Sequence, residues 1–310
     1  MNICIVCNHP TLDLSMESIA KLDAPSTVDP NDNSPSNWKG PKFCPSCHLV
    51  QSKPSYHERS LTIDRMNHAT KVPATEADHL EPLLAQIKSI MEKKPSEKHF
   101  VEIGYGKGSL IEMIKDQPWD ISAMDPAGES LGQSYQDVQF SNKPFKDFSV
   151  REITEKFGKA RLAAAINTLS FIVEPHSFMR ALKTALNKGG MMLIQEPWLP
   201  LLLNEDHEDP NLYKRYWYFS LSSLNYMVAS HDLIVIDVSE SEVNKGDVCV
   251  LVGKKGEHYP KPSVQSWLDK EKLAGANDPK QWAQWLNPAA NSGLLYPFAQ
   301  DEAEEATTES

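Results

Sequence analysis

Apolar positions change their spacing repeatedly between residues 76 and 252. Over residues 76–91 they recur every three to four positions, as on one face of a helix. Short apolar runs of strand length then alternate with further helical patterns. The expected helices are Glu76–Met91, Ser109–Lys115, Pro175–Leu186 and Ser220–Ser230. The expected strands are His99–Gly104, Asp120–Met124, Val138–Phe140, Arg161–Ile166, Met191–Gln195, Leu233–Val238 and Val248–Val252.

This alternation predicts an α/β fold, with a Rossmann-like, mostly parallel sheet covered by helices on both faces. The helix over 175–186 is expected to end at the turn Asn187-Lys188-Gly189-Gly190. The last two strands follow one another closely, which favours an antiparallel hairpin at one edge of the sheet.

The same pattern predicts the domain organisation. Residues 1–55 contain two cysteine pairs around a loop rich in Pro, Asp, Asn and Ser, with few apolar residues to form a core. The expected divisions are a zinc-binding domain over 1–55, a connector and helix over 56–98, the α/β domain over 99–258, a helical C-terminal extension over 259–298 and a disordered acidic tail over 299–310.

Charge and composition narrow the possible partners. The 310 residues carry a formal net charge of -11, and no basic stripe is present, so nucleic acid is an unlikely partner. The chain shows neither a signal-peptide pattern nor an apolar run long enough for a membrane helix. We therefore expect a cytoplasmic protein with a small-molecule substrate and no membrane partner; the sequence leaves the oligomeric state open.

Four of the five cysteines form two Cys-x-x-Cys pairs, Cys4 with Cys7 and Cys44 with Cys47. Each pair can present both sulfurs on one tight turn, and two turns complete a tetrahedral, structural Zn²⁺ site. The alternatives are reduced, merely buried thiols, or ligation by the adjacent His9 or His48. Cys249 lies in an apolar strand and is interpreted as a core residue.

A glycine-rich segment follows the strand expected at 99–104. Gly104, Tyr105, Gly106 and Gly108 form a Gly-x-Gly-x-Gly loop that opens a helix, and Glu102 comes just before it. Glycines permit a tight turn and close approach of the backbone to a ligand. Dinucleotide-binding folds use similar loops, so the motif alone does not decide the cofactor.

Two further segments end neighbouring strands. Asp125 and Pro126 end the second strand, where an acid can accept hydrogen bonds from both ribose hydroxyls of an adenosine; a turn or helix cap is the alternative role for Asp125. Asn167, Thr168 and Leu169 end the fourth strand. Ligands of open α/β sheets bind beyond the carboxyl ends of the strands, so these residues are expected to line the cofactor.

The glycine loop, the acid after the second strand and the Asn167-Thr168-Leu169 segment together resemble class I methyltransferases. The resemblance implies S-adenosylmethionine as cofactor. A closer resemblance is to sugar C-methyltransferases with an N-terminal zinc-binding domain, which act on nucleotide-linked keto-deoxysugars. The segments that carry it are 44–51, Gln195-Glu196-Pro197-Trp198 and 218–224.

The sequence departs from that family at two places. Phe171 stands where the family has a histidine, and Tyr213-Lys214-Arg215-Tyr216-Trp217 replaces a His-Glu-His segment. Because few residues follow Val252, no counterpart of the family's C-terminal domain is expected either. The resemblance therefore implies the cofactor and the architecture more than the substrate.

Candidate catalytic residues lie after the fifth strand: Glu196, His207, Tyr216 and Tyr218. The tyrosines are alternatively packing residues, and His207 is alternatively part of a solvated acidic loop. One hypothesis makes residues 213–219 a lid over the substrate. The expected function is methyl transfer from S-adenosylmethionine to a small molecule of a natural-product or sugar pathway. The alternatives are an RNA or protein methyltransferase and a non-catalytic scaffold that binds the cofactor.

Overall fold

The computed structural model describes residues 3–14, 41–51, 76–126, 135, 137–198, 215–241 and 247–286. The chain divides into two compact units, each built from more than one segment. We call residues 1–54, 199–224 and 268–310 the knuckle unit, and residues 55–198 and 225–267 the sheet unit.

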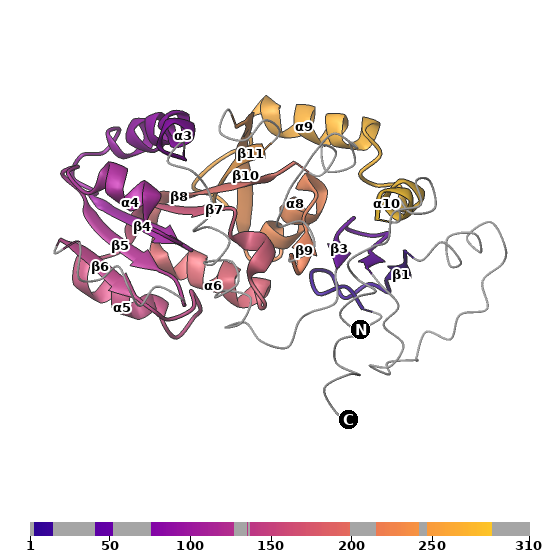
Figure 1. Cartoon of the computed structure of the whole chain (residues 1–310), viewed down its shortest axis with the longest axis horizontal. Coiled ribbons are helices and arrows are strands. Elements are labelled where there is room, and N and C mark those ends of the chain that lie inside the picture. Colours follow the sequence, from indigo (N-terminus) through magenta and orange to yellow (C-terminus); the bar gives the residue numbers. More distant parts are fainter. Residues whose placement is uncertain are drawn as a thin grey trace, which may run out of the picture. The chain divides into compact units, whose positions relative to one another are not determined.

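Seven strands of the sheet unit form one sheet in the order β10-β11-β8-β7-β4-β5-β6 (Figure 1). The strands are β4 (His99–Ile103), β5 (Asp120–Met124), β6 (Val138–Ser141), β7 (Ala160–Ile166), β8 (Leu186–Pro197), β10 (Leu233–Glu240) and β11 (Asp247–Lys254). All neighbouring pairs from β6 to β8 are parallel, and β11 runs antiparallel to both β8 and β10. The expected parallel sheet with an antiparallel hairpin at one edge is confirmed.

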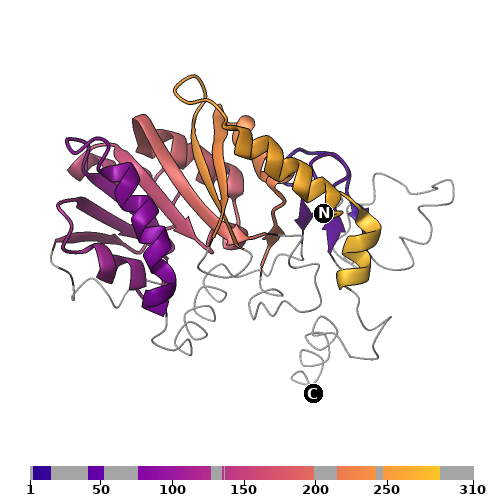
Figure 2. The same cartoon turned by 90° about the horizontal axis from the view of Figure 1, so that it is seen from above.

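Helices cover both faces of this sheet. The helices α3 and α4 lie on the face seen in Figure 2, and α5 and α6 lie on the other. They are α3 (Glu76–Met91), α4 (Ser109–Ile114), α5 (Val150–Phe157) and α6 (Pro175–Ala185), with a short 3-10 helix, η3 (Leu169–Phe171), before α6. Leucine and isoleucine side chains of α3 and α4 join those of the central strands in one hydrophobic cluster. The short helix α5 was not among the expected elements.

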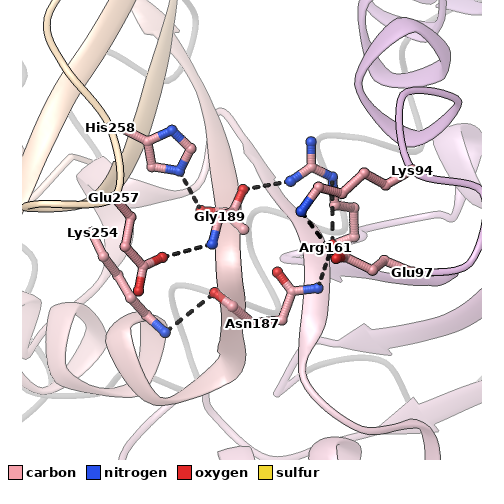
Figure 3. Close-up of polar contacts among 9 residues, drawn as sticks. Lys94, Glu97, Arg161, Asn187, Gly189, Lys254, Glu257 and His258 are labelled. Carbon is pink, nitrogen blue, oxygen red and sulfur yellow. Dashed lines mark hydrogen bonds and ion pairs between the residues drawn. The ribbon is translucent and has the colours of Figure 1, made fainter.

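The start of β8 differs from expectation. The preceding helix ends at Ala185 and the strand begins at Leu186, five residues before the expected start, with a register irregularity opposite the start of β7. Side chains satisfy the backbone there (Figure 3): Arg161 donates to the Gly189 carbonyl, and the Gly189 N–H donates to Glu257 at 2.6 Å. Lys254 donates to the Leu186 carbonyl at 2.6 Å. These bonds hold residues 187–190, expected as a turn, in the irregular start of β8, where Gly189 has a positive φ angle of 74°.

The knuckle unit contains a small antiparallel sheet in the order β1-β2-β3-β9. The strands are β1 (Leu12–Asp13), β2 (Lys42–Phe43), β3 (Val50–Gln51) and β9 (Trp217–Tyr218). Buried side chains from all three segments of the unit form its core: Leu14, Phe43, Val50, Tyr218, Trp282 and Ala283. The strand β9 and the helix α10 (Pro279–Leu286) thus complete a core that begins in residues 12–51.

Two more helices, α8 (Leu221–Ala229) and α9 (Pro262–Leu273), follow β9 and β11 along the chain. Within the knuckle unit, the buried Glu271 carboxylate accepts hydrogen bonds from the Leu221 and Ser222 N–H groups at 2.6 and 3.0 Å. A carboxylate at this position satisfies free donors of the first turn of a helix and interacts favourably with its dipole. In the part of the chain described here, no helix combines the length and the hydrophobicity needed to cross a membrane.

Candidate cofactor site and cysteine cluster

The glycine loop joins β4 to α4. Gly104, Gly106 and Gly108 all have positive φ angles, of 75°, 55° and 80°, in the region that favours glycine. The Gly104 N–H donates to the Met124 carbonyl at 2.7 Å, and the Gly108 N–H donates to the Tyr105 carbonyl at 2.7 Å. The expected tight turn between strand and helix is therefore present.

This loop lies where the order of the strands reverses. From β4 the chain proceeds to β5 and β6 on one side, and then to β7 on the other side of β4. In open α/β sheets such a switch point opens a crevice beyond the carboxyl ends of the two central strands. The parallel strands β4, β5 and β7 all end at this edge of the sheet, and the loops that follow them begin there.

The loops after β4 and β7 approach each other closely at Gly104. A Cβ atom built on Gly104 would lie 2.3 Å from Oγ1 and 2.6 Å from Cγ2 of Thr168. The Thr168 hydroxyl donates to the Ile166 carbonyl at 2.9 Å, which orients the side chain. Thr168 therefore packs against the glycine loop, and only glycine fits opposite it.

Asp125 connects the end of β5 to the same loop. The Gly106 N–H donates to Oδ2 of Asp125 at 3.0 Å, and the Asp125 N–H donates to the Ser141 carbonyl at 3.1 Å. Asp125 is buried, and Pro126 after it is exposed. A Cβ atom on Gly106 would meet no described atom within 4 Å, so the loop borders open space at this point.

Glu102 is the most unusual acid of the site. It is 4% exposed, and no described residue donates a hydrogen bond to its Oε2 atom. Burial, and then the neighbouring Asp125 carboxylate, raise the pKa of Glu102 to about 8. Burial also raises the pKa of Tyr105 above its usual range, with smaller contributions from Asp125 and Glu102.

The segment after β7 lies beside the end of β8. Asn167 has a positive φ angle of 49°, and its N–H donates to the Gln195 carbonyl at 2.8 Å. Leu169, fully buried, begins η3. The structure thus brings the predicted cofactor residues from three strand ends to one edge of the sheet.

Among the predicted catalytic residues, Glu196 lies at this edge. Both of its carboxylate oxygens accept hydrogen bonds from Ser170, one from the N–H at 3.2 Å and one from the hydroxyl at 2.7 Å. Both side chains are buried. The sequence analysis missed Ser170, and its position directly after Asn167-Thr168-Leu169 was the available signal.

The other catalytic candidates are Tyr216, Tyr218 and His207. Tyr216 and Tyr218 belong to the knuckle unit, where both are buried and Tyr218 is part of the hydrophobic core. His207 lies outside the described residues. Glu196 belongs to the sheet unit, so the structure places the two tyrosines and Glu196 in different units.

The four paired cysteines form one cluster. The candidate ligand sulfurs of Cys4, Cys7, Cys44 and Cys47 all lie within 4.8 Å of one another, with separations of 3.5 Å for Cys4–Cys47 and 3.4 Å for Cys7–Cys44. Tetrahedral ligation with metal–sulfur bonds of about 2.3 Å places sulfurs roughly 3.8 Å apart. The cluster therefore has the residue types and the dimensions to hold a metal ion.

The two turns that carry these cysteines share one hydrogen-bond pattern. The Cys4 N–H donates to the His9 carbonyl and the Asn8 N–H to the Cys4 carbonyl, and the corresponding bonds of the second turn follow the same spacing (Cys44 to Leu49, and His48 to Cys44). Asn8 and His48, the residues after each pair, both have positive φ angles, 58° and 63°. Within the described residues the candidate metal cluster consists of the four cysteines, without His9 or His48.

Comparison with known proteins identifies the sheet unit. A family model described as a methyltransferase domain matches residues 76–238, which is more than half of the chain. The chain belongs to this family, the class I methyltransferases that depend on S-adenosylmethionine. The matched residues include the glycine loop, Asp125, the Asn167–Leu169 segment and Glu196.

One curated relative is the C-methyltransferase NovU of Streptomyces niveus, 27% identical over 177 residues. The match covers 56% of this chain and 42% of NovU, so the chain corresponds to less than half of that relative. Similar solved structures include the CcbJ methyltransferase of Streptomyces caelestis (12% identity, TM-score 0.47, 65% of this chain and 100% of that one). Another is the 1,6-didemethyltoxoflavin-N1-methyltransferase of Burkholderia thailandensis (15% identity, TM-score 0.45, 70% of this chain and 99% of that one).

The residues of the site fit the cofactor of this methyltransferase family. S-Adenosylmethionine combines an adenosine with a cationic sulfonium and an α-ammonium group. The space beside Gly106 leaves the loop backbone accessible, and Asp125 and Glu102 offer two acidic side chains at the same edge. The Oε2 atom of Glu102, which no described residue satisfies, is a ready acceptor for such a ligand.

Proposed function

We propose that this chain transfers a methyl group from S-adenosylmethionine to a small-molecule acceptor. The observation that carries the proposal is the geometry of the switch point. There the left-handed glycine loop, the Asp125 carboxylate bound to Gly106 N–H and the Thr168 contact with Gly104 surround an accessible backbone. S-Adenosylmethionine supplies an already activated methyl group, so positioning of the two substrates contributes much of the rate.

The cofactor is proposed to contact residues from three strand ends. Asp125, held by Gly106, would accept hydrogen bonds from the ribose hydroxyls, and the loop backbone would approach the rest of the cofactor closely. Thr168 acts on the loop through its contact with Gly104. The full proposed set is Glu102, Gly104, Tyr105, Gly106, Gly108, Asp125, Pro126, Asn167, Thr168 and Leu169.

Glu196 is the proposed acid–base residue on the acceptor side. It lies at the carboxyl end of β8, beside the Asn167 backbone, and Ser170 donates to both of its carboxyl oxygens. A carboxyl group oriented at this edge is suited to exchange a proton with an acceptor during methyl transfer.

Catalytic roles for Tyr216, Tyr218 and His207 stay predictions. Because Tyr218 is fully buried in the knuckle core, an alanine at this position would remove packing as well as the hydroxyl. Phenylalanine at Tyr216 or Tyr218 retains the ring. Unchanged turnover in both phenylalanine variants would therefore exclude a chemical role for either hydroxyl.

The proposed acceptor class is a natural-product or sugar intermediate. The relative NovU, a C-methyltransferase, supports this class, as does the resemblance of residues 44–51 and 195–198 to sugar C-methyltransferases. Carbon, oxygen and nitrogen acceptors differ in their need for a base. Acceptor trials should therefore begin with nucleotide-linked keto sugars and compare wild type with Glu196→Gln.

We also propose that the four cysteines bind a structural Zn²⁺. Four thiolates fill a tetrahedral shell and leave no open position for catalysis. Metal content of the purified chain, compared between wild type and Cys44→Ser, tests this proposal. Cys249→Ser is the matched control, because Cys249 is buried in β11 outside the cluster. Loss of one bound zinc in Cys44→Ser alone is expected, and a zinc-free wild type would contradict the proposal.

Calorimetric titration with S-adenosylmethionine and its demethylated product tests the cofactor site. We expect saturable binding by wild type and its loss in Asp125→Ala and Gly106→Arg. The arginine side chain at position 106 would enter the open space beside the loop. Gly256→Arg is the matched control, since Gly256 also has a positive φ angle (85°), and a Cβ atom added there would meet no described atom within 4 Å.

The outcomes of this titration separate the possible functions. Binding that survives in Gly256→Arg but not in Gly106→Arg supports the cofactor site and justifies the acceptor trials. Failure of the folded, metal-loaded wild type to bind either ligand would refute the methyltransferase function.

A further inference from the structure

We infer that the Glu102 carboxyl group carries a proton in the cofactor-free protein and releases it when S-adenosylmethionine binds. The inference rests on the proposed function, because it concerns the same cofactor. It adds a linkage between cofactor affinity and pH, and it assigns that linkage to one side chain.

The position of Glu102 in the sheet explains why it holds a proton. Side chains of a strand alternate between faces, so Glu102 shares a face with Phe100, which belongs to the large hydrophobic cluster under α3 and α4. Opposite Glu102 in the sheet lie Ala123 of β5 and Ala164 of β7, both fully buried. Neither alanine can donate a side-chain hydrogen bond to the buried carboxyl group.

The titratable neighbours of Glu102 also favour its protonated form. The Asp125 carboxylate, at the end of β5, opposes a second negative charge beside it, and the Tyr105 phenol of the glycine loop stays protonated and neutral. Asp125 itself is stabilised by the Gly106 N–H at 3.0 Å, whereas Oε2 of Glu102 has no donor among the described residues. The buried Glu102 carboxyl group, which lacks such a donor, therefore holds a proton.

A cationic ligand reverses this balance. S-Adenosylmethionine carries a sulfonium and an α-ammonium group, and a positive charge near a buried carboxyl group favours its ionised form. Glu102 then loses its proton to the solvent, and its carboxylate neutralises part of the ligand's charge. The reaction balances as one carboxylic acid converted to one carboxylate and one released proton, with no other reactant.

The test is calorimetric titration of S-adenosylmethionine into the metal-loaded full chain in buffers of different ionisation enthalpy, which gives the number of protons exchanged. For a pKa of about 8, release of about 0.9 proton is expected at pH 7 and about 0.1 at pH 9. The control is Glu102→Gln, which matches the protonated side chain in shape. At and below pH 7 the α-amino group of the cofactor is mostly protonated in the free and the bound state, so there the difference between the two proteins measures Glu102.

The affinity should change in parallel. Between pH 9 and pH 7, the dissociation constant of wild type should rise about tenfold relative to that of Glu102→Gln, since the proton competes with the ligand. Equal proton counts for the two proteins would overturn the inference while leaving the methyltransferase function intact. Absence of any binding by folded wild type would instead refute the proposed function, and this inference with it.

A second measurement covers the case in which Glu102→Gln does not bind. Carbon NMR of the chain labelled at the glutamate carboxyl carbons identifies the Glu102 signal by its absence from the Glu102→Gln spectrum. At pH 7 the signal should lie at the protonated position in the free protein and move to the ionised position on addition of S-adenosylmethionine. A Glu102 signal already ionised in the free protein would contradict the inference.

Discussion

Gly104→Ala tests the close approach of the loops after β4 and β7. The added methyl group would lie 2.3 Å from Oγ1 and 2.6 Å from Cγ2 of Thr168, at a position with a φ angle of +75°. Both distances are well below van der Waals contact, so either the threonine or the loop must move. Gly106→Ala is the natural comparison, since its φ angle is +55° but its Cβ would meet no described atom within 4 Å.

The two substitutions share one destabilising effect and differ in another. A left-handed backbone conformation costs a non-glycine residue about 1–2 kcal/mol, so this amount is subtracted from the free energy of unfolding of both variants. Overpacking of a tight contact costs a further 1–3 kcal/mol or so, which falls on Gly104→Ala alone. We therefore expect the free energy of unfolding to fall by about 2–5 kcal/mol in Gly104→Ala and by about 1–2 kcal/mol in Gly106→Ala.

The assay is thermal unfolding of the metal-loaded chain, followed by circular dichroism, on both single variants and on the double variant Gly104→Ala with Thr168→Ala. Removing Oγ1 and Cγ2 of Thr168 should recover most of the overpacking cost, so the two changes should couple favourably in a double-mutant cycle. If Gly104→Ala proves no less stable than Gly106→Ala, or if the cycle shows no coupling, the packing of Thr168 on the glycine loop is refuted.

Three further predictions concern stability. The imidazole of His99 is buried, with its nitrogens 2.7 Å from the Gly158 carbonyl and 2.9 Å from the Ser122 hydroxyl, and burial lowers its pKa below 6.5. The unfolded chain therefore binds the proton first, so stability should fall as pH decreases below about 6.5, and His99→Asn should lose that part of the pH dependence in thermal unfolding. Removal of metal with a chelator should disrupt the small knuckle core and shift the fluorescence of the buried Trp282 to longer wavelength, a change reduced in Trp282→Phe, where Trp217 of β9 still reports; an unshifted spectrum in the metal-free chain would argue against a structural metal. Glu271→Ala leaves the Leu221 and Ser222 N–H groups without their acceptor and should reduce stability by about 1–3 kcal/mol, with Glu271→Gln intermediate in denaturation measurements.

Features encoded by local spacing could be predicted from the sequence. The glycines of residues 104–108 need no partner to indicate a left-handed turn, and each Cys-x-x-Cys pair indicates its own tight turn. The alternation of strand and helix patterns predicted a mostly parallel sheet covered on both faces, because each pattern is continuous along the chain. The residues of the Asn187–Gly190 segment are typical of a turn, and Gly189 has a positive φ angle of 74°, but donors and acceptors from β7 and from residues 254–258 hold the segment within the irregular start of β8.

Features that depend on distant segments could not be predicted. The two residues of β9 pair with β3, far earlier in the chain, and so short a strand has no periodicity of its own. The tyrosine at position 218 was therefore interpreted without its true neighbours, Phe43 and Trp282. The isolation of Glu102 likewise depends on Ala123 and Ala164, which are small residues of other strands and have no individual signal in the sequence.

The discontinuity of the knuckle unit has a consequence for the order of events during synthesis on the ribosome. All four cysteines emerge before residue 52, whereas β9, the strand that covers the free side of β3, follows roughly 170 residues later. At typical translation speeds the edge of β3 waits about 8–35 seconds for its partner. An ion captured early by the cysteines would hold the two turns together through this interval and keep an exposed strand edge from pairing with other nascent chains.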